Sequence, residues 1–317
     1  MALLKKRCVF GAKTETTPGT KQTLLAADAA FNVYDLEIAP DIKLDERPAQ
    51  GSFGTQKSPP GGRKAKATFK IDCAFDGLVI PTWANTLFPA CALIKTGNVY
   101  APKTQTPDTA GAVVKTLTIG KWTDGKFSSI FGAMGTFKWG LPTGEISVLE
   151  FEFEGIYDGE VDAAMPVPTY PNEPKLRAAG GPTTYDSVGL CMESMNFDIG
   201  NSIYLKQCST TEHGYDLAIV SDRKAKITGN PESKLVAQQP RMGLFLAGTE
   251  KVLRYVIPAP GYVSGTGAKS IEILANQAQI VANKEGDRNG VAIDDLTWQL
   301  NQSLSIPDSD FTITFNI

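Results

Sequence analysis

The sequence predicts a mainly β protein made of two tandem copies of one domain, each a β-sandwich or barrel with a short helix beside it. The first observation is a repeat: Arg-Lys-Ala-Lys occurs twice, and in each copy a helix-like apolar patch and then an alternating strand follow it. A period near half the chain indicates a duplicated domain. The second observation is many short strands with regularly spaced turn residues, which is typical of sandwiches and barrels. The matching pairs are residues 63–66 and 223–226, 85–92 and 242–249, and 146–154 and 291–300.

The length of 317 residues suits two domains of ordinary size. We expect an N-terminal domain over residues 1–165 and a C-terminal domain over residues 183–317. Residues 166–182 between them are rich in Pro and then in Ala and Gly. This composition predicts a linker that is stiff at its start and flexible at its end.

The first half begins with an arm, residues 8–25, which lacks a clear period and needs a partner surface to become ordered. A single helical turn at 26–31 and a strand within 33–44 follow. Residues 45–62, rich in Pro and Gly, form a long irregular loop between two strands. Loops of this length inside a domain are usually functional or disordered.

After this loop, alternation predicts a strand at 65–75, and the spacing of apolar residues predicts a helix at 79–93, which Pro89 would bend or end. Alternating residues 113–119 precede the turn Asp124-Gly125. Further strands are expected in both halves, at 132–138, 147–155, 190–199, 217–220, 223–228, 252–257, 270–280, 291–300 and 311–317.

Composition and charge exclude several classes of protein. A net charge of −3 and a pI of about 5.4 argue against a protein that grips nucleic acid through its phosphates. No apolar run is long enough to span a bilayer, so no membrane partner is expected. The first residues do not read as a signal peptide, and we expect a chain made and kept in a cytoplasm. Five cysteines without a CxxC pair predict reduced, mostly buried thiols.

Catalytic patterns are weak. The single histidine, His213, lies in a polar stretch and is interpreted as a solvated loop residue. No metal-ligand spacing, phosphate loop or nucleophile elbow is found, so we expect neither an enzyme nor a cofactor.

Two sets of polar residues are the candidate functional positions. On the closing strands, alternation turns one set outward: Glu150, Glu152 and Glu154 in the first copy, and Asp295, Thr297 and Gln299 in the second. Paired carboxylates could hydrolyse glycosides, but three in a row favour a wet sheet face. The repeated tetrapeptides could bind phosphate, but edge protection or a subunit salt bridge is the better interpretation; these contact candidates are Arg63, Lys66, Arg223 and Lys226.

Several segments resemble the major tail tube proteins of long, non-contractile phage tails. The resemblance lies in Glu15-Thr-Thr-Pro-Gly-Thr20 with residues 23–29, in 148–157, in Asn196–Asn201 and in 220–229. The order of these segments, spread over nearly the whole chain, carries the resemblance.

The resemblance implies a structural virion protein whose rings stack into a tube around the DNA channel. Two tandem domains would close the ring as a trimer with pseudo-six-fold symmetry. The outward residues named above would face the lumen, and loop 45–62 would reach the adjacent ring through Arg47, Phe53, Gln56, Pro59 and Pro60. Implied partners are copies of itself, a tape measure protein, tail completion or terminator and distal tail proteins, and double-stranded DNA that passes without specific binding.

Two other functions stay open. A carbohydrate-binding or adhesin-type double β-sandwich would use tryptophans as sugar platforms, and the candidates are Trp83, Trp122, Trp139 and Trp298. A hydrolase would use Glu152 and Glu154, but the sequence offers no positioned base or nucleophile for it.

Overall fold

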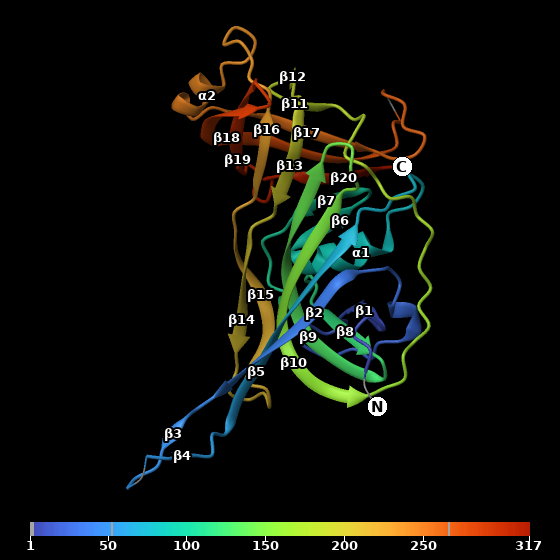
Figure 1. The fold of residues 1–317 in the computed structure, drawn as a ribbon, viewed down its shortest axis with the longest axis vertical. Coiled ribbons are helices and arrows are strands. Elements are labelled where there is room, and N and C mark those ends of the chain that lie inside the picture. Colours follow the sequence, from blue (N-terminus) through green and yellow to red (C-terminus); the bar gives the residue numbers. More distant parts are fainter. Residues whose placement is uncertain (1–2, 52, 266) are drawn as a thin grey trace.

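Strands dominate the chain, which confirms the predicted mainly β class (Figure 1). The computed structural model describes residues 3–51, 53–265 and 267–317. We call the part from β1 to β10 the first module and the part from β11 to β20 the second module. The strands of the first module are β1 (Cys8–Thr14), β2 (Tyr34–Leu44), β3 (Arg47–Pro48), β4 (Thr55–Gln56), β5 (Pro60–Asp72), β6 (Leu93–Thr96), β7 (Val99–Pro102), β8 (Leu117–Thr123), β9 (Lys126–Pro142) and β10 (Val148–Asp162).

The second module continues the numbering. Its strands are β11 (Thr183–Tyr185), β12 (Val188–Gly189), β13 (Met192–Asp198), β14 (Asn201–Gln207), β15 (Tyr215–Arg223), β16 (Lys226–Pro231), β17 (Glu250–Pro258), β18 (Ser270–Arg288), β19 (Val291–Leu300) and β20 (Thr312–Asn316). The helices are short: α1 (Thr82–Leu87), α2 (Arg241–Ala247), and the 3-10 turns η1 (Ala26–Asp28) and η2 (Phe88–Cys91).

The two modules share one strand order. The first reads β1-β8-β9-β10-β5-β2, and the second reads β11-β17-β18-β19-β16-β13, with antiparallel pairing throughout. Helix α1 lies between β5 and β8 along the chain, and α2 lies between β16 and β17. Each module also carries a hairpin between its edge strand and the next: β3–β4 in the first, β14–β15 in the second.

The correspondence extends to single residues. Lys66 lies opposite Glu154, and Lys226 lies opposite Gln299. Two residues further along β5 and β16, Thr68 lies opposite Glu152 and Thr228 opposite Thr297. The repeated tetrapeptides therefore mark equivalent positions in the two modules.

A strand junction joins both modules into one sheet. Residues 194–198 of β13 pair with residues 138–142 of β9, on the edge of β9 that β8 occupies nearer its start. A second connection comes from β20, which pairs with both β18 and β7.

Each module curls so that its first strand packs across an apolar core on a later strand, β1 on β5 in the first module and β11 on β19 in the second. In the first module the ring of Phe10 lies 4.6 Å from that of Phe69, and in the second Tyr185 lies 5.7 Å from Trp298. The core continues through the junction, where Phe197 contacts Phe137 at 5.9 Å. The modules therefore share one hydrophobic interior.

The segment that connects the modules is packed, so the flexible end expected from its composition is wrong. Leu176 is 2% exposed, and its N–H donates to the Cys73 carbonyl at 2.7 Å. Its own carbonyl accepts the N–H of Ser147 at 3.0 Å. Backbone hydrogen bonds and a buried leucine hold this segment against the first module.

Four local predictions need correction. The arm expected at residues 8–25 begins with strand β1, which pairs with β8 of its own chain, so these residues need no partner surface to become ordered. The helix expected at 79–93 is shorter, because the chain tightens into η2 where Pro89 stands and turns at Ala92, whose φ is 56°. The loop expected at 45–62 contains the β3–β4 hairpin. All five cysteines are free, but only Cys73 and Cys91 are buried, because the others lie outside the core. None of the helices in the described part of the chain has the length and apolarity to cross a bilayer.

Candidate assembly surfaces

The outward residues of the closing strands lie on one polar face of the sheet. On β10, Phe151 and Phe153 are buried while the glutamates between them point to the opposite face. Each glutamate pairs with a lysine of β5: Lys70 with Glu150 at 2.9 Å, Lys66 with Glu152 at 2.6 Å, and Lys64 with Glu154 at 3.3 Å.

This pairing gives the face a mixed charge instead of the acidic one expected from the sequence. The hydrogen bond that Lys66 donates to Glu152 raises the pKa of Lys66, so that lysine stays protonated. In the second module Asp295, Thr297 and Gln299 lie on the same face, which continues across the junction through Asn196 and Thr228. Alternating, paired charges offer a polyanion no continuous basic strip. That these residues line a channel stays a prediction.

Of the four contact candidates, Arg63 and Arg223 lie where the modules meet. The Arg63 N–H donates to the His213 carbonyl at 3.2 Å, and its guanidinium is 3.6 Å from Glu212. Arg223 is almost buried, and its Nε donates to Asp310 at 2.8 Å. Lys66 and Lys226 instead lie on the polar face, where Lys226 is 3.8 Å from Asp198. A ring role for the four stays a prediction.

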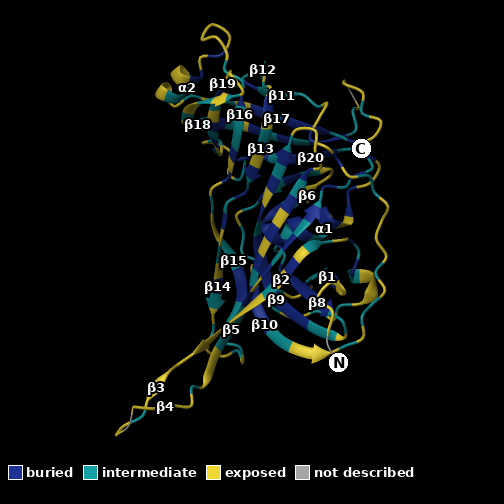
Figure 2. Ribbon diagram, viewed as in Figure 1, coloured by how far each residue is buried: buried dark blue, intermediate teal, exposed yellow. Residues whose placement is uncertain are grey.

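The two hairpins occupy different surroundings. β14–β15 packs on the first module, where Leu205 and Ala218 contact Phe131 and Met134. The β3–β4 hairpin projects from the molecule, and both of its strands are exposed (Figures 1 and 2). The loop candidates Arg47, Phe53 and Gln56 lie on it, and Phe53 is fully exposed. The other two, Pro59 and Pro60, are exposed where β5 begins.

A buried carboxylate, Glu15, holds the surface on which the second hairpin rests, and the sequence analysis did not identify this role. It is 1% exposed and accepts hydrogen bonds from the hydroxyls of Thr116 and Thr118 and from the N–H groups of Gly19 and Gly132, at 2.6 to 2.9 Å. One of these glycines, Gly132, lies so close to Leu217 of β15 that a Cβ would sit 3.3 Å from its Cα. Burial raises the pKa of Glu15, and the hydrogen bonds offset part of that rise. The sequence signal for this role was a single glutamate in a threonine-rich stretch just before Pro18-Gly19.

The remaining candidates for chemistry are structural. His213 is half-buried beside the ring of Phe131 at 5.6 Å, so its interpretation as a solvated residue is wrong. The four tryptophans proposed as sugar platforms are each at most 6% exposed, because all of them pack into the core; they are Trp83, Trp122, Trp139 and Trp298. This removes the observation that favoured carbohydrate binding.

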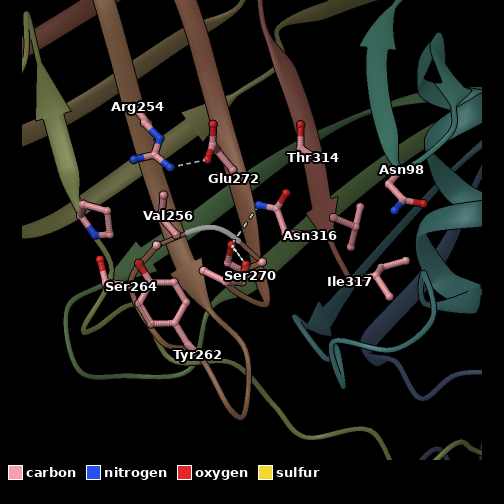
Figure 3. Close-up of a pocket in the computed structure, with 15 residues that line it drawn as sticks. Asn98, Arg254, Val256, Tyr262, Ser264, Ser270, Glu272, Thr314, Asn316 and Ile317 are labelled. Atoms are coloured by element: carbon pink, nitrogen blue, oxygen red, sulfur yellow. Dashed lines mark hydrogen bonds and ion pairs between the residues drawn. The ribbon is translucent and has the colours of Figure 1, made fainter.

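A hollow of about 810 Å³ lies on the second module under the loop that joins β17 to β18 (Figure 3). Arg254 donates to Glu272 at 2.7 Å, and the Asn316 amide donates to Ser270 at 3.0 Å. These pairs neutralise its charged groups. Within the described residues, no group of three His, Cys, Asp or Glu side chains is placed to hold a metal ion.

No protein-family model matches the chain, and no curated protein is similar to it at a significant level. The functional argument therefore rests on the sequence pattern and the geometry above.

Proposed function

We propose that this chain is a structural subunit of the tail tube of a long-tailed, non-contractile phage, in which copies assemble into stacked rings. Trimeric rings with pseudo-six-fold symmetry fit two equivalent modules per chain. The observation that carries the proposal is the junction: two modules of one strand order already join edge to edge within the chain. Repeating such a head-to-tail contact between copies produces a ring when the rotation closes.

Two further features support the proposal. The polar face runs across both modules, and the charges on its β5–β10 part are paired, as suits a wall past which DNA slides without binding. The projecting hairpin supplies a segment that can order against a stacked ring. In the virion the tube would meet a tape measure protein, completion or terminator proteins and distal tail proteins.

Sedimentation velocity combined with negative-stain microscopy tests this function. We expect the purified chain to form rings or tubes as its concentration rises, with an open centre in end-on views. A monodisperse monomer at every concentration and salt condition would overturn the proposal. Retention on a glycan array by such a monomer would favour the carbohydrate-binding alternative.

A further inference from the structure

Two strand edges in the sheet are open, and they correspond to the two strands of the internal junction. At one end of the sheet β2 pairs with β5 alone, and among the described residues no strand occupies its outer edge. In the second module β18 lies between β17 and β19 but pairs with β17 only up to Gln279, so that edge of residues 281–288 meets no strand in the described chain. Since β2 corresponds to β13 and β18 to β9, these edges are the unpaired counterparts of the internal junction.

We propose that β2 of one copy pairs antiparallel with residues 284–286 of β18 in a second copy, in the register of the internal junction. This inference rests on the proposed function and specifies how its copies meet. Ala39 corresponds to Asp198, because they lie opposite Lys66 and Lys226. Lys284 corresponds to Lys138, because they lie opposite Asp295 and Glu150.

The register follows from these equivalences. Inside the chain Asp198 lies opposite Lys138 and Asn196 opposite Gly140. Between copies, Ala39 then lies opposite Lys284, and Glu37 lies opposite Gly286.

The residues on these edges suit that register. At the internal junction Gly140 lies opposite Asn196, and the corresponding position 286 is a glycine as well. The internal ladder ends at Asp198, and in β2 the residue after Ala39 is Pro40, which has no N–H to continue a ladder. The Leu36 carbonyl already accepts a hydrogen bond from the Lys121 ammonium at 2.9 Å. The free part of the β2 edge therefore begins at Glu37.

Charge is complementary across the proposed junction. Glu37 and Lys284 are both exposed, and among the described residues neither has an ion pair within 4.0 Å. In the proposed register they lie on the same face as diagonal neighbours, which long side chains can bridge. Asp35 and Arg288 lie further along the same edges, where Lys70 and Glu232 of their own chain already pair with them at 3.7 and 3.3 Å.

Charge reversal tests the junction. We expect Glu37→Lys and Lys284→Glu each to raise the concentration needed for ring formation about tenfold, through repulsion of like charges. The double variant should restore assembly, since it recreates the pair with exchanged signs. Glu145→Lys, at an exposed turn position, is the control with the same change in net charge as Glu37→Lys and should assemble normally.

Cross-linking tests the register independently. Ala39→Cys with Lys284→Cys, in a background with Cys8, Cys191 and Cys208 replaced by Ser, places two thiols opposite each other at a spacing that allows a disulfide. Oxidation by diamide, which takes up the two hydrogens of the thiols, should give covalent oligomers on a non-reducing gel. Ala39→Cys with Glu285→Cys puts the thiols on opposite faces and should not cross-link.

The outcomes separate this junction from the proposed function. Rings of the wild-type chain, with normal assembly of both reversal variants and no cross-link, would overturn the junction and leave the tube subunit standing. A wild-type chain that stays monomeric throughout would overturn the function and the junction together. Rescue by the double variant and a cross-link specific to the 39–284 pair would establish the junction.

Discussion

The two modules have the same strand order but different surroundings. The edge of the second module, β13, is covered by β9, and its hairpin rests on the first module. The corresponding edge of the first module, β2, is open, and its hairpin projects into solvent. Ile203 of β14 is packed against the first module, while Leu44, the last residue of β2 before the free hairpin, is 59% exposed. The same edge strand and hairpin are thus covered by a neighbouring module in the second module and left uncovered in the first.

The largest expected contrast concerns the aromatic residue at the closed edge. Phe197 is fully buried, and its ring lies 4.9 Å from that of Phe311. Its counterpart in β2 is Ile38, which is half-exposed. We expect Phe197→Ala to lower the free energy of unfolding by about 3–5 kcal/mol. Ile38→Ala should cost less than about 2 kcal/mol. Urea denaturation at a concentration where the chain is monomeric measures both, and equal losses would show that the two edges are equally packed.

The two equivalent arginines provide a second contrast. Arg223 has a side chain 9% exposed between Asp308 and Asp310, whereas the Arg63 side chain is 38% exposed. Removing one partner of a buried ion pair leaves uncompensated charge, so Arg223→Ala should cost about 3–5 kcal/mol. Arg63→Ala, which removes an exposed pair, should cost at most about 1 kcal/mol. A thermal melt of each variant checks this, and a larger loss for Arg63→Ala would reverse the comparison.

A third experiment uses pH to examine how the closed contact is supported. Because burial raises the pKa of Glu15, the folded chain holds that proton more tightly than the unfolded chain. The contribution of Glu15 to stability is therefore full below its ordinary pKa and falls as pH rises through the raised value. Glu15→Gln should remove this dependence and place an amide N–H against a glycine N–H, at a cost of about 1–3 kcal/mol.

Denaturation of the wild type and Glu15→Gln between pH 4 and 7 tests this expectation. The difference in free energy of unfolding between the two should shrink as pH rises. A difference that is constant, or that grows with pH, would contradict a carboxyl group that is harder to ionise in the folded chain.

The smallest effect on stability is expected at the free hairpin. In the single chain the ring of Phe53 is fully exposed, so Phe53→Ser should change the free energy of unfolding by less than about 0.5 kcal/mol. Under the proposed function the same variant should shorten or abolish stacked tubes while single rings persist in negative stain. Tubes of normal length would show that this side chain has no part in stacking.

Local patterns predicted the β class and the equivalent strands because alternation and the repeated tetrapeptide are local signals. Alternation turned Thr297 and Gln299 outward, and Trp298 between them is buried. The junction of β13 with β9 was not predictable, since pairing between strands distant in sequence depends on tertiary contacts that alternation does not encode.

The connecting segment and the polar face show the same limit. Composition indicated a flexible end of the connecting segment, but Leu176 is buried and its backbone is hydrogen-bonded to the first module. The acidic pattern of Glu150 to Glu154 gave no sign of the lysines of β5, because they come from another strand. Charge along one strand does not predict the charge of a face.

The strand β20 has a consequence for biosynthesis. Ile313 pairs with Tyr100, so β7 gains that neighbour only after residue 313 has left the ribosome. Phe315 then closes on Phe75 at 5.3 Å and covers the interior beside α1. Contacts between such remote segments form slowly. The nascent chain therefore remains incompletely folded until β20 has been made, which delays its readiness to join other copies.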